Sequence, residues 1–384
     1  MVFYHHLMVG AVGGWSPPWY WSWCASGPAA VMVFFVLSGY VVGIGYRPLP
    51  AGSSAVAVRT YLGRRAVRLI PINFVAVLLA CVVADAVDLP TVLGNLLFLQ
   101  NFADYGGSRV LVLHGNINLW SLNYEVVFYL LFALIWWRGA SLGWTLVLTS
   151  AVGLLGWFGL GVPLFVACYA FGFVFWLTGL WLAWRAGPAP EERGNWPSCV
   201  LLALITWKLQ VVAEILIPLD ATVPRFAGPV VKLYHLDFLP ACVWLVAVVG
   251  RRSFRGLGAV KITAALIPLL GIGVRWMRQP DFLTSDTVAI VAVYALAMAL
   301  WSWCPTAHIF QRCASVGLIS YALYATASPI QSAIFHFGRR LPRNLWSFAL
   351  CALATVAVAI GVAWYLERRL QPAINRGLGR RVPR

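Results

Sequence analysis

One carboxylate lies inside a long apolar run of the chain: Glu125, in the segment 120–129. On a helix, Glu125 would share a face with Ser121 and Tyr129, which lie four residues to either side. That face would present a carboxylate flanked by two hydroxyl groups to the interior of a helix bundle. Ionisable groups inside membrane spans are costly and are functional-site candidates by default. The alternative interpretation is a structural carboxylate that is hydrogen-bonded to a neighbouring helix.

Two histidines, His5 and His6, lie near the beginning of the chain. An imidazole can accept a proton from a hydroxyl group near neutral pH, which few other side chains can do. The spacing of the two histidines is equally consistent with a topogenic or interfacial pair.

Four arginines, Arg59, Arg64, Arg65 and Arg68, precede or begin the apolar run 67–88. Arg65 and Arg68 are three residues apart and would lie on one helical face at the membrane surface. The planar guanidinium group suits phosphate recognition. A plain positive-inside anchor is the alternative, and spacing alone favours it.

Other polar residues in apolar surroundings give weaker signals. Lys208 and Glu214 are six residues apart and do not share a face, which favours structural pairing with other helices. His114 could line an entrance for an acceptor or be a solvated loop histidine. Ser38 lacks the Gly-x-Ser-x-Gly context of a nucleophile elbow. The small-residue spacing of Gly153, Gly156 and Gly159 favours helix packing.

The composition requires lipid as the outer solvent. The chain has 384 residues, of which 61% are hydrophobic and 10% are charged, with a mean hydropathy of +0.81. Soluble domains carry about 25% charged residues, so a water-soluble fold could not cover itself. The 20 tryptophans also favour a membrane protein, because indole rings collect at the depth of the lipid headgroups. The net charge of +16 does not indicate nucleic-acid binding, because the basic residues lie in short gaps between apolar runs.

The fold class predicted from these runs is an all-α, polytopic transmembrane helix bundle with about ten to twelve spans. The predicted spans are approximately 28–46, 67–88, 119–137, 141–160, 163–184, 198–218, 236–250, 258–276, 285–304, 314–335 and 346–366. The run 1–12 is expected to be the tail of a helix that lacks its front half. Residues 1–370 are predicted to form one integral membrane domain, followed by a basic cytoplasmic tail over 371–384.

The distribution of arginines sets the orientation. If the segment with Arg64 is cytoplasmic, most arginines of the chain fall on the cytoplasmic side, which the positive-inside rule favours. Arg275 and Arg278, and the cluster over 339–343, fall on the other side.

Four motifs in the first third of the chain resemble the acyltransferase 3 family of polytopic membrane O-acyltransferases. They are Val2-Phe3-Tyr4-His5, Val33-Phe34-Phe35-Val36-Leu37-Ser38-Gly39-Tyr40, Tyr61-Leu62-Gly63-Arg64-Arg65-Ala66-Val67-Arg68-Leu69-Ile70-Pro71, and Trp120-Ser121-Leu122 with Glu125 and Phe128-Tyr129. Their order and spacing match the family. Ser320-Tyr321-Ala322-Leu323-Tyr324 and Tyr365-Leu366-Glu367 resemble later family elements. Two features depart from the pattern: Ala327 replaces a frequent histidine, and the usual arginine about ten residues before the first histidine would precede Met1.

The resemblance implies transfer of an acyl group, commonly acetyl, from acyl-CoA to a hydroxyl group. Acceptors in the family are sugars of surface polysaccharides, glycolipids, peptidoglycan and natural products. The resemblance implies a multi-pass protein of the inner (cytoplasmic) membrane, in contact with membrane lipids. No metal-ligand spacing appears, so no metal is expected.

The same resemblance suggests a role for each candidate residue. His5 would be the general base, and Glu125 would orient it or assist proton transfer. Arg64, Arg65 and Arg68 would hold the phosphates of coenzyme A. The residues expected at the acceptor are Trp120, Ser121, Tyr129 and Ser38.

The main alternative function is a transporter or flippase for a lipid-linked or glycosylated substrate, which would also be polytopic with intramembrane charges. Such proteins often contain inverted repeats with paired broken helices, and no such pair is evident in the sequence.

Overall fold

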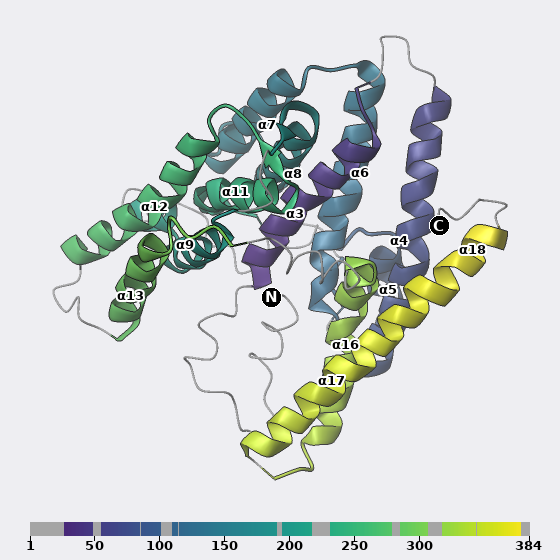
Figure 1. The fold of residues 1–384 in the computed structure, drawn as a ribbon. Coiled ribbons are helices and arrows are strands. Elements are labelled where there is room, and N and C mark those ends of the chain that lie inside the picture. The colour runs from purple at the N-terminus through teal and green to yellow at the C-terminus, as the bar shows by residue number, and fades with distance from the viewer. Residues whose placement is uncertain are drawn as a thin grey trace. The chain divides into compact units, whose positions relative to one another are not determined.

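The computed structural model is helical, and its described residues contain a single pair of two-residue strands (Figure 1). It describes residues 27–48, 55–84, 86–100, 110–113, 115–189, 194–216, 231–278, 285–305, 317–342 and 344–377. The chain packs as two compact units, which are described separately. Of the described residues, unit 1 contains those within Pro50–Gly139 and Cys313–Arg384, and unit 2 contains those within Pro28–Leu49 and Ala140–Arg312.

Each unit is a bundle of apolar helices. Unit 1 holds α4 (Ala55–Val83), α5 (Leu89–Leu96), the 3₁₀ helix η2 (Ile117–Leu119), α6 (Trp120–Arg138), α16 (Ser320–Gly338), α17 (Leu345–Tyr365), the π-helical turn η4 (Leu366–Leu370) and α18 (Gln371–Gly377). Unit 2 holds α3 (Gly27–Gly45), α7 (Leu142–Trp157), α8 (Leu164–Arg185), β1 (Gly187–Pro188), α9 (Trp196–Leu209), α10 (Val211–Leu216), the 3₁₀ helix η3 (Leu233–Phe238), α11 (Leu239–Val249), β2 (Arg252–Ser253), α12 (Leu257–Arg278) and α13 (Ser285–Ala299).

The predicted all-α, polytopic bundle is confirmed. Among the described residues, seven helices are long and apolar enough to cross a membrane: Gly27–Gly45, Ala55–Val83, Ile117–Arg138, Leu164–Arg185, Trp196–Ile215, Leu257–Arg278 and Leu345–Gly377. Three shorter apolar helices accompany them, at Leu142–Trp157, Leu233–Val249 and Asp286–Ala299. The total of ten to twelve crossings and the domain boundary at residue 370 stay predictions.

Most predicted spans coincide with one helix, and two differ in an informative way. The run 198–218 is divided, because Gln210 has a left-handed backbone (φ 45°) between α9 and α10. The run 67–88 corresponds to α4, which begins at Ala55 and ends at Val83. Arg59, Arg64 and Arg65, which precede the predicted run, therefore lie within the helix itself. The run 1–12 lies outside the described residues.

In unit 2, α8 is the most buried span, and glycines allow α3 to approach it closely. In the apolar window of α8, 72% of the residues are buried. A Cβ atom added at Gly39 of α3 would lie 2.8 Å from the carbonyl carbon of Trp176, and one added at Gly179 would lie 2.7 Å from that of Val36. The two backbones are thus in contact through reciprocal glycines, as is common where membrane helices cross.

The glycines of α7 also pack against α8, as predicted for two of the three. Cβ atoms added at Gly153 and Gly156 would meet Phe171 at 2.6 Å and Ala167 at 2.9 Å. Gly159 differs: it follows the end of α7 with a positive φ of 70°, and nothing lies within 4 Å of an added Cβ. Its role is to form the turn, because the left-handed region is strained for other residues.

The arginines that the orientation rule left on the unexpected side in unit 2 form ion pairs. Arg278 lies 3.6 Å from Glu214 of α10, and Arg275 lies 3.6 Å from Asp286 of α13. Glu214 therefore pairs with another helix, as predicted.

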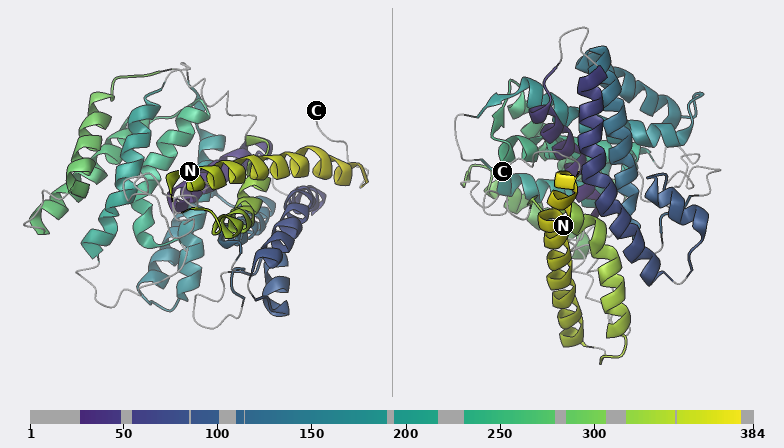
Figure 2. Two further views of the ribbon diagram at one scale, coloured as in Figure 1. Left: turned by 90° about the horizontal axis from the view of Figure 1, so that it is seen from below. Right: turned by 90° about the vertical axis from the view of Figure 1, so that its right-hand side faces the viewer.

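In unit 1, α6 is the most buried span, and the C-terminal helices form a hairpin over α4. In the apolar window of Ile117–Arg138, 67% of the residues are buried. The helices α16 and α17 lie side by side (Figures 1 and 2), with the rings of Phe335 and Phe348 5.8 Å apart. The π turn joins α17 to α18 as one continuous rod, so residues 371–377 of the predicted tail are helical.

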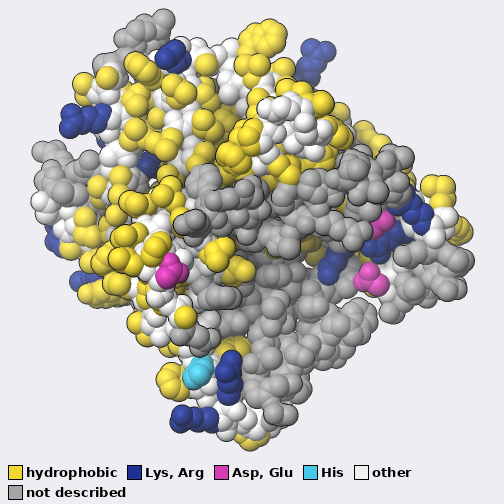
Figure 3. Space-filling model, turned by 180° about the vertical axis from the view of Figure 1, so that it is seen from behind, with side chains coloured by type: hydrophobic (Ala, Val, Ile, Leu, Met, Phe, Trp, Pro, Cys, Tyr) yellow, Lys and Arg dark blue, Asp and Glu magenta, His cyan; other side chains and the backbone are white. Residues whose placement is uncertain are grey.

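Large apolar side chains are exposed on the helices, as a lipid-facing surface requires. On the face drawn in Figure 3, hydrophobic side chains cover wide areas, and charged groups appear as scattered spots. Examples of exposed residues are Val82, Met277 and Trp346, each at least 80% exposed. The chain is a multi-pass membrane protein.

Candidate functional site

The predicted polar face of α6 exists and is buried within unit 1. Glu125 is 4% exposed and Tyr129 6%. The hydroxyl of Tyr129, one turn further along α6, donates a hydrogen bond to Oε1 of Glu125. Ser121, one turn earlier, is fully buried. The spacing of four residues thus places all three side chains on one face, as predicted.

Arg65 of α4 packs against the Tyr129 end of this face. Its guanidinium carbon lies 4.9 Å from the centroid of the Tyr129 ring and 5.6 Å from that of Tyr61. A cation over the face of an aromatic ring is attracted by the ring quadrupole. Arg65 therefore forms part of the surroundings of Glu125 and Tyr129.

Helix α16 fixes the beginning of α6 through Tyr324. The hydroxyl groups of Tyr324 and Ser121 are 2.7 Å apart, and Tyr324 also donates to the carbonyl oxygen of Asn118 at 2.8 Å. In return, the amide nitrogen of Asn118 donates to the carbonyl oxygen of Tyr324 at 3.2 Å. These directional bonds define the rotation of α6 that directs Glu125 into the unit.

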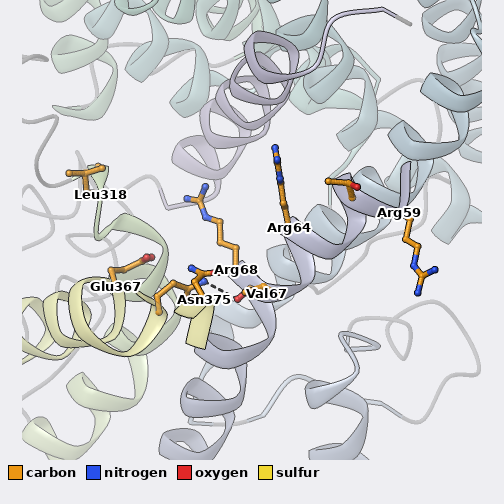
Figure 4. A pocket seen from close by; sticks show the side chains of 10 residues that line it. Arg59, Arg64, Val67, Arg68, Leu318, Glu367 and Asn375 are labelled. Carbon is orange, nitrogen blue, oxygen red and sulfur yellow. Dashed lines mark hydrogen bonds between the residues drawn. The ribbon is translucent and has the colours of Figure 1, made fainter. Parts of the chain in front are cut away.

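A cavity of about 990 Å³ opens beside the arginines of α4 (Figure 4). It is lined by Arg59, Thr60, Arg64, Val67, Arg68, Gly317, Leu318, Glu367, Gln371 and Asn375. Figure 4 shows Arg64 and Arg68 on the same side of α4, with Glu367 facing them from the C-terminal helix and Arg59 turned away. Two arginines of α4 thus face one carboxylate across the cavity, and this excess of positive charge would attract anions.

The C-terminal helix contributes to this cavity every fourth residue: Glu367, Gln371 and Asn375. Glu367 lies in the π turn, and its carboxylate accepts a hydrogen bond from the backbone of Ala322 in the first turn of α16. Single π turns inside α-helices are frequent at functional sites. Here the turn belongs to the segment that closes the cavity over α4.

Tyr321 is near both the residues of the cavity and the buried carboxylate. It interacts electrostatically with Glu125 and Tyr129 and also with Arg68 and Glu367. Its hydroxyl donates to the carbonyl oxygen of Leu69, one residue beyond Arg68, at 3.2 Å. The arginine cavity and the Glu125 face are therefore neighbours within one unit.

The structure brings some of the predicted site residues together and separates others. Glu125, Ser121 and Tyr129 share one face, while Arg64 and Arg68 line the cavity and Arg65 does not. Trp120 is buried with its ring 5.6 Å from that of Tyr124.

Two further predicted positions have a different status. His5 lies outside the described residues, as do His6 and His114. Ser38 belongs to unit 2, where it accepts a hydrogen bond from the indole nitrogen of Trp176 at 3.3 Å.

Sequence reasoning missed the residues that complete the site from the C-terminal third of the chain. Tyr321 and Tyr324 belong to the motif 320–324, but the motif alone does not indicate what they contact. Glu367, Gln371 and Asn375 were not grouped, although their spacing of four residues is the helical signal that could have identified them. Among the described residues, no group of three or more histidine, cysteine, aspartate or glutamate side chains could hold a metal ion.

Comparison with known proteins identifies the family of the chain. Residues 1–367 match the model of a family described as an acyltransferase domain. The chain is also 27% identical to the acyltransferase MdmB of Streptomyces mycarofaciens over 380 residues, which cover 93% of this chain and 83% of that protein. No solved structure matches the chain.

Proposed function

As the chain belongs to this acyltransferase family and is a membrane acyltransferase, we propose that it moves an acyl group, commonly acetyl, from acyl-CoA to a hydroxyl group of its acceptor. The observation that carries the proposal is the arginine-lined cavity beside the buried Glu125 face, with Tyr321 interacting with residues of both.

The donor substrate fits the cavity in charge and in size. Acyl-CoA carries several phosphate groups, and guanidinium groups bind phosphate through paired, charge-assisted hydrogen bonds. Arg64 and Arg68 supply two such groups on adjacent turns of α4. A volume of about 990 Å³ is at the upper end of the range of about 300–1,000 Å³ for ligand pockets, as a nucleotide with an attached arm requires. Glu367 and Asn375 add polar contacts from the opposite wall.

In the proposed reaction, His5 removes the proton of the acceptor hydroxyl as general base. The acceptor oxygen attacks the thioester carbonyl carbon, the carbon–sulfur bond breaks, and the proton passes from the imidazole to the departing thiolate. Glu125 orients the imidazole or assists the proton transfer. The hydrogen bond from Tyr129 to Glu125 fixes the carboxylate for this role.

The acceptor is proposed to be a sugar, glycolipid, surface polysaccharide or hydroxylated natural product, bound near Trp120, Ser121 and Tyr129. Buried aromatic and hydroxyl groups at the beginning of α6 suit a ligand that carries both apolar and hydroxyl surfaces. The membrane is proposed to be the inner membrane, with the arginine cavity on its cytoplasmic side, because arginines favour that side.

The test is transfer of labelled acetyl from acetyl-CoA by purified protein to candidate acceptors, with two sets of variants. Loss of a charge-assisted hydrogen bond costs about 1.5–3 kcal/mol, so we expect Arg64→Ala with Arg68→Ala to raise the KM for acetyl-CoA at least about tenfold. We expect Glu125→Gln to lower kcat at least about a hundredfold, the lower end of the range of general acid–base contributions.

The matched control for the arginine variants is Arg339→Ala. Arg339 lines a different cavity, of about 530 Å³, at the other ends of α4 and α16. Unchanged transfer by correctly inserted Glu125→Gln or His5→Ala would contradict the proposed chemistry. Movement of substrate across vesicles without transfer of label would support the transporter alternative.

A further inference from the structure

Pro71 leaves a backbone carbonyl of α4 without its usual donor. In an α-helix the N–H of each residue bonds to the carbonyl four residues earlier, and proline has no N–H. The carbonyl that Pro71 deprives is that of Val67. In a membrane such a group must be satisfied by another part of the protein. The side-chain nitrogen Nε2 of Gln371 donates to this carbonyl at 2.8 Å.

The same arrangement occurs a second time in unit 1. Pro329 lies inside α16, and the carbonyl four residues earlier belongs to Ala325. The side-chain nitrogen Nδ2 of Asn116 donates to that carbonyl at 2.6 Å, and Asn116 is fully buried. In both cases a side-chain amide that is distant in sequence replaces the missing N–H.

The Gln371 bond lies within the arginine cavity. Val67 is between Arg64 and Arg68 on α4, and both Val67 and Gln371 line the cavity. Gln371 is 9% exposed. Among the described residues, this hydrogen bond is one of the contacts between α18 and α4. Glu367, in the turn before α18, accepts a hydrogen bond from the backbone of Ala322 in α16.

We propose that Gln371 is a positioning residue of the donor site: it replaces the hydrogen bond that Pro71 removes and holds the C-terminal helix against α4. This sets the distance between the arginines of α4 and the polar side chains of the C-terminal helix. The inference rests on the proposed function, because the role concerns acyl-CoA binding. Asn116 performs the corresponding task for α16, at the beginning of α6 rather than at the cavity.

The test is a double-mutant cycle with Gln371→Met and Pro71→Ala. Methionine has the length of glutamine but no N–H donor. Alanine at position 71 restores a backbone N–H for the carbonyl of Val67. The dissociation constant of CoA is measured by calorimetry on protein in detergent, together with KM for acetyl-CoA, kcat and the unfolding midpoint.

We expect Gln371→Met to weaken CoA binding and to raise KM about tenfold, with kcat at saturating donor within about twofold. In the Pro71→Ala background the same substitution should weaken binding threefold or less. Asn116→Leu is the matched control: its effect should fall on kcat, and Pro329→Ala, not Pro71→Ala, should relieve it. If Gln371→Met folds poorly, recovery of folding when Pro71→Ala is added would equally support the proposal, and no recovery would contradict it.

Two results separate the inference from the function on which it rests. Wild-type protein that binds no CoA overturns the proposed function and the donor-site role with it. Wild-type protein that binds CoA, with Gln371→Met binding it equally well or with no relief by Pro71→Ala, overturns the positioning role alone.

Discussion

Replacement of Gly39 by alanine tests the close crossing of α3 and α8 in unit 2. An added Cβ would lie 2.8 Å from the carbonyl carbon of Trp176, closer still to its oxygen, and 3.2 Å from the backbone nitrogen of Leu180. Ordinary contacts of a Cβ begin at 3.4 Å. Because all three obstructing atoms are helix backbone, no side chain can rotate away, and the helices must separate.

The expected cost follows from the nature of this obstruction. Overpacking lowers the free energy of unfolding by about 1–3 kcal/mol. Because the obstructing atoms belong to rigid helix backbone, we expect the loss for Gly39→Ala to be at the upper end of this range. With roughly 2–4 °C per kcal/mol for a folding unit of 150–250 residues, a range that includes unit 2, about 3 kcal/mol lowers Tm by about 6–12 °C.

Native cysteines provide the assay. Cys168, Cys199 and Cys242 are buried in unit 2, so a thiol-reactive dye reports the temperature at which they become accessible. Gly45→Ala is the matched control, because nothing lies within 4 Å of a Cβ added at Gly45 of the same helix. An unchanged midpoint for Gly39→Ala, or an equal fall for Gly45→Ala, would refute the reasoning.

Three further substitutions test individual contacts. Tyr324→Phe removes the hydroxyl that lies 2.7 Å from Ser121 Oγ; we expect kcat to fall about tenfold, as for loss of a buried hydrogen bond, with an unchanged KM for acetyl-CoA in steady-state assays. Arg252→Met removes the bond from Nε to the Tyr40 hydroxyl at 2.9 Å; we expect Tm in the thiol assay to fall by about 2–4 °C, for about 1 kcal/mol. Glu214→Gln breaks the ion pair with Arg278, in which both side chains are more than a third exposed. We expect the free energy of unfolding to change by less than about 1 kcal/mol, with almost no shift of Tm in the thiol assay. A large shift of Tm would contradict the surface character of this pair.

The sequence was sufficient to predict the helices and the polar face of α6, because both depend on local spacing. Glu125 and Tyr129 are four residues apart, and one turn of helix brings them together wherever the helix lies. The break at Gln210 was not predictable in the same way, since its left-handed backbone depends on the packing around it.

Spacing could not decide which arginines face the cavity. Arg64 and Arg68 differ by about 40° around the helix, and Arg65 and Arg68 by about 60°, so both pairs share a face. The neighbouring residues decide which arginines face the cavity. Tyr129 of α6 contacts Arg65. Arg64 and Arg68 line the cavity together with Glu367 and Gln371. Those neighbours are distant in sequence.

The prolines show the same limit at a finer scale. The presence of Pro71 and Pro329 inside predicted spans is enough to identify the carbonyls of Val67 and Ala325 as deprived of a donor. The sequence does not identify the donor that replaces it. Gln371 is separated from Val67 by 304 positions.

The contacts that specify how the helices of each unit meet follow from the solvent. Lipid competes with helices for apolar contacts, so apolar packing alone specifies little about how membrane helices meet. In unit 2, backbones approach closely at Gly39 and Gly179, and side chains such as Tyr40, Ser198 and Tyr294 bond to backbone carbonyls of other elements. In unit 1, hydrogen bonds from side chains to backbone carbonyls surround the site, made by Asn116, Asn118, Tyr321, Tyr324 and Gln371.

Such bonds are directional, and they join the elements that carry Glu125 and the arginines of the cavity. Each one contributes only about 0.5–1.5 kcal/mol to stability, a small part of what holds the unit together. Each one also fixes the orientation of a site helix, and catalysis is sensitive to displacements of about 1 Å. Removal of a single bond in unit 1 should therefore change the kinetic constants more than the unfolding midpoint, whereas Gly39→Ala in unit 2 should do the reverse.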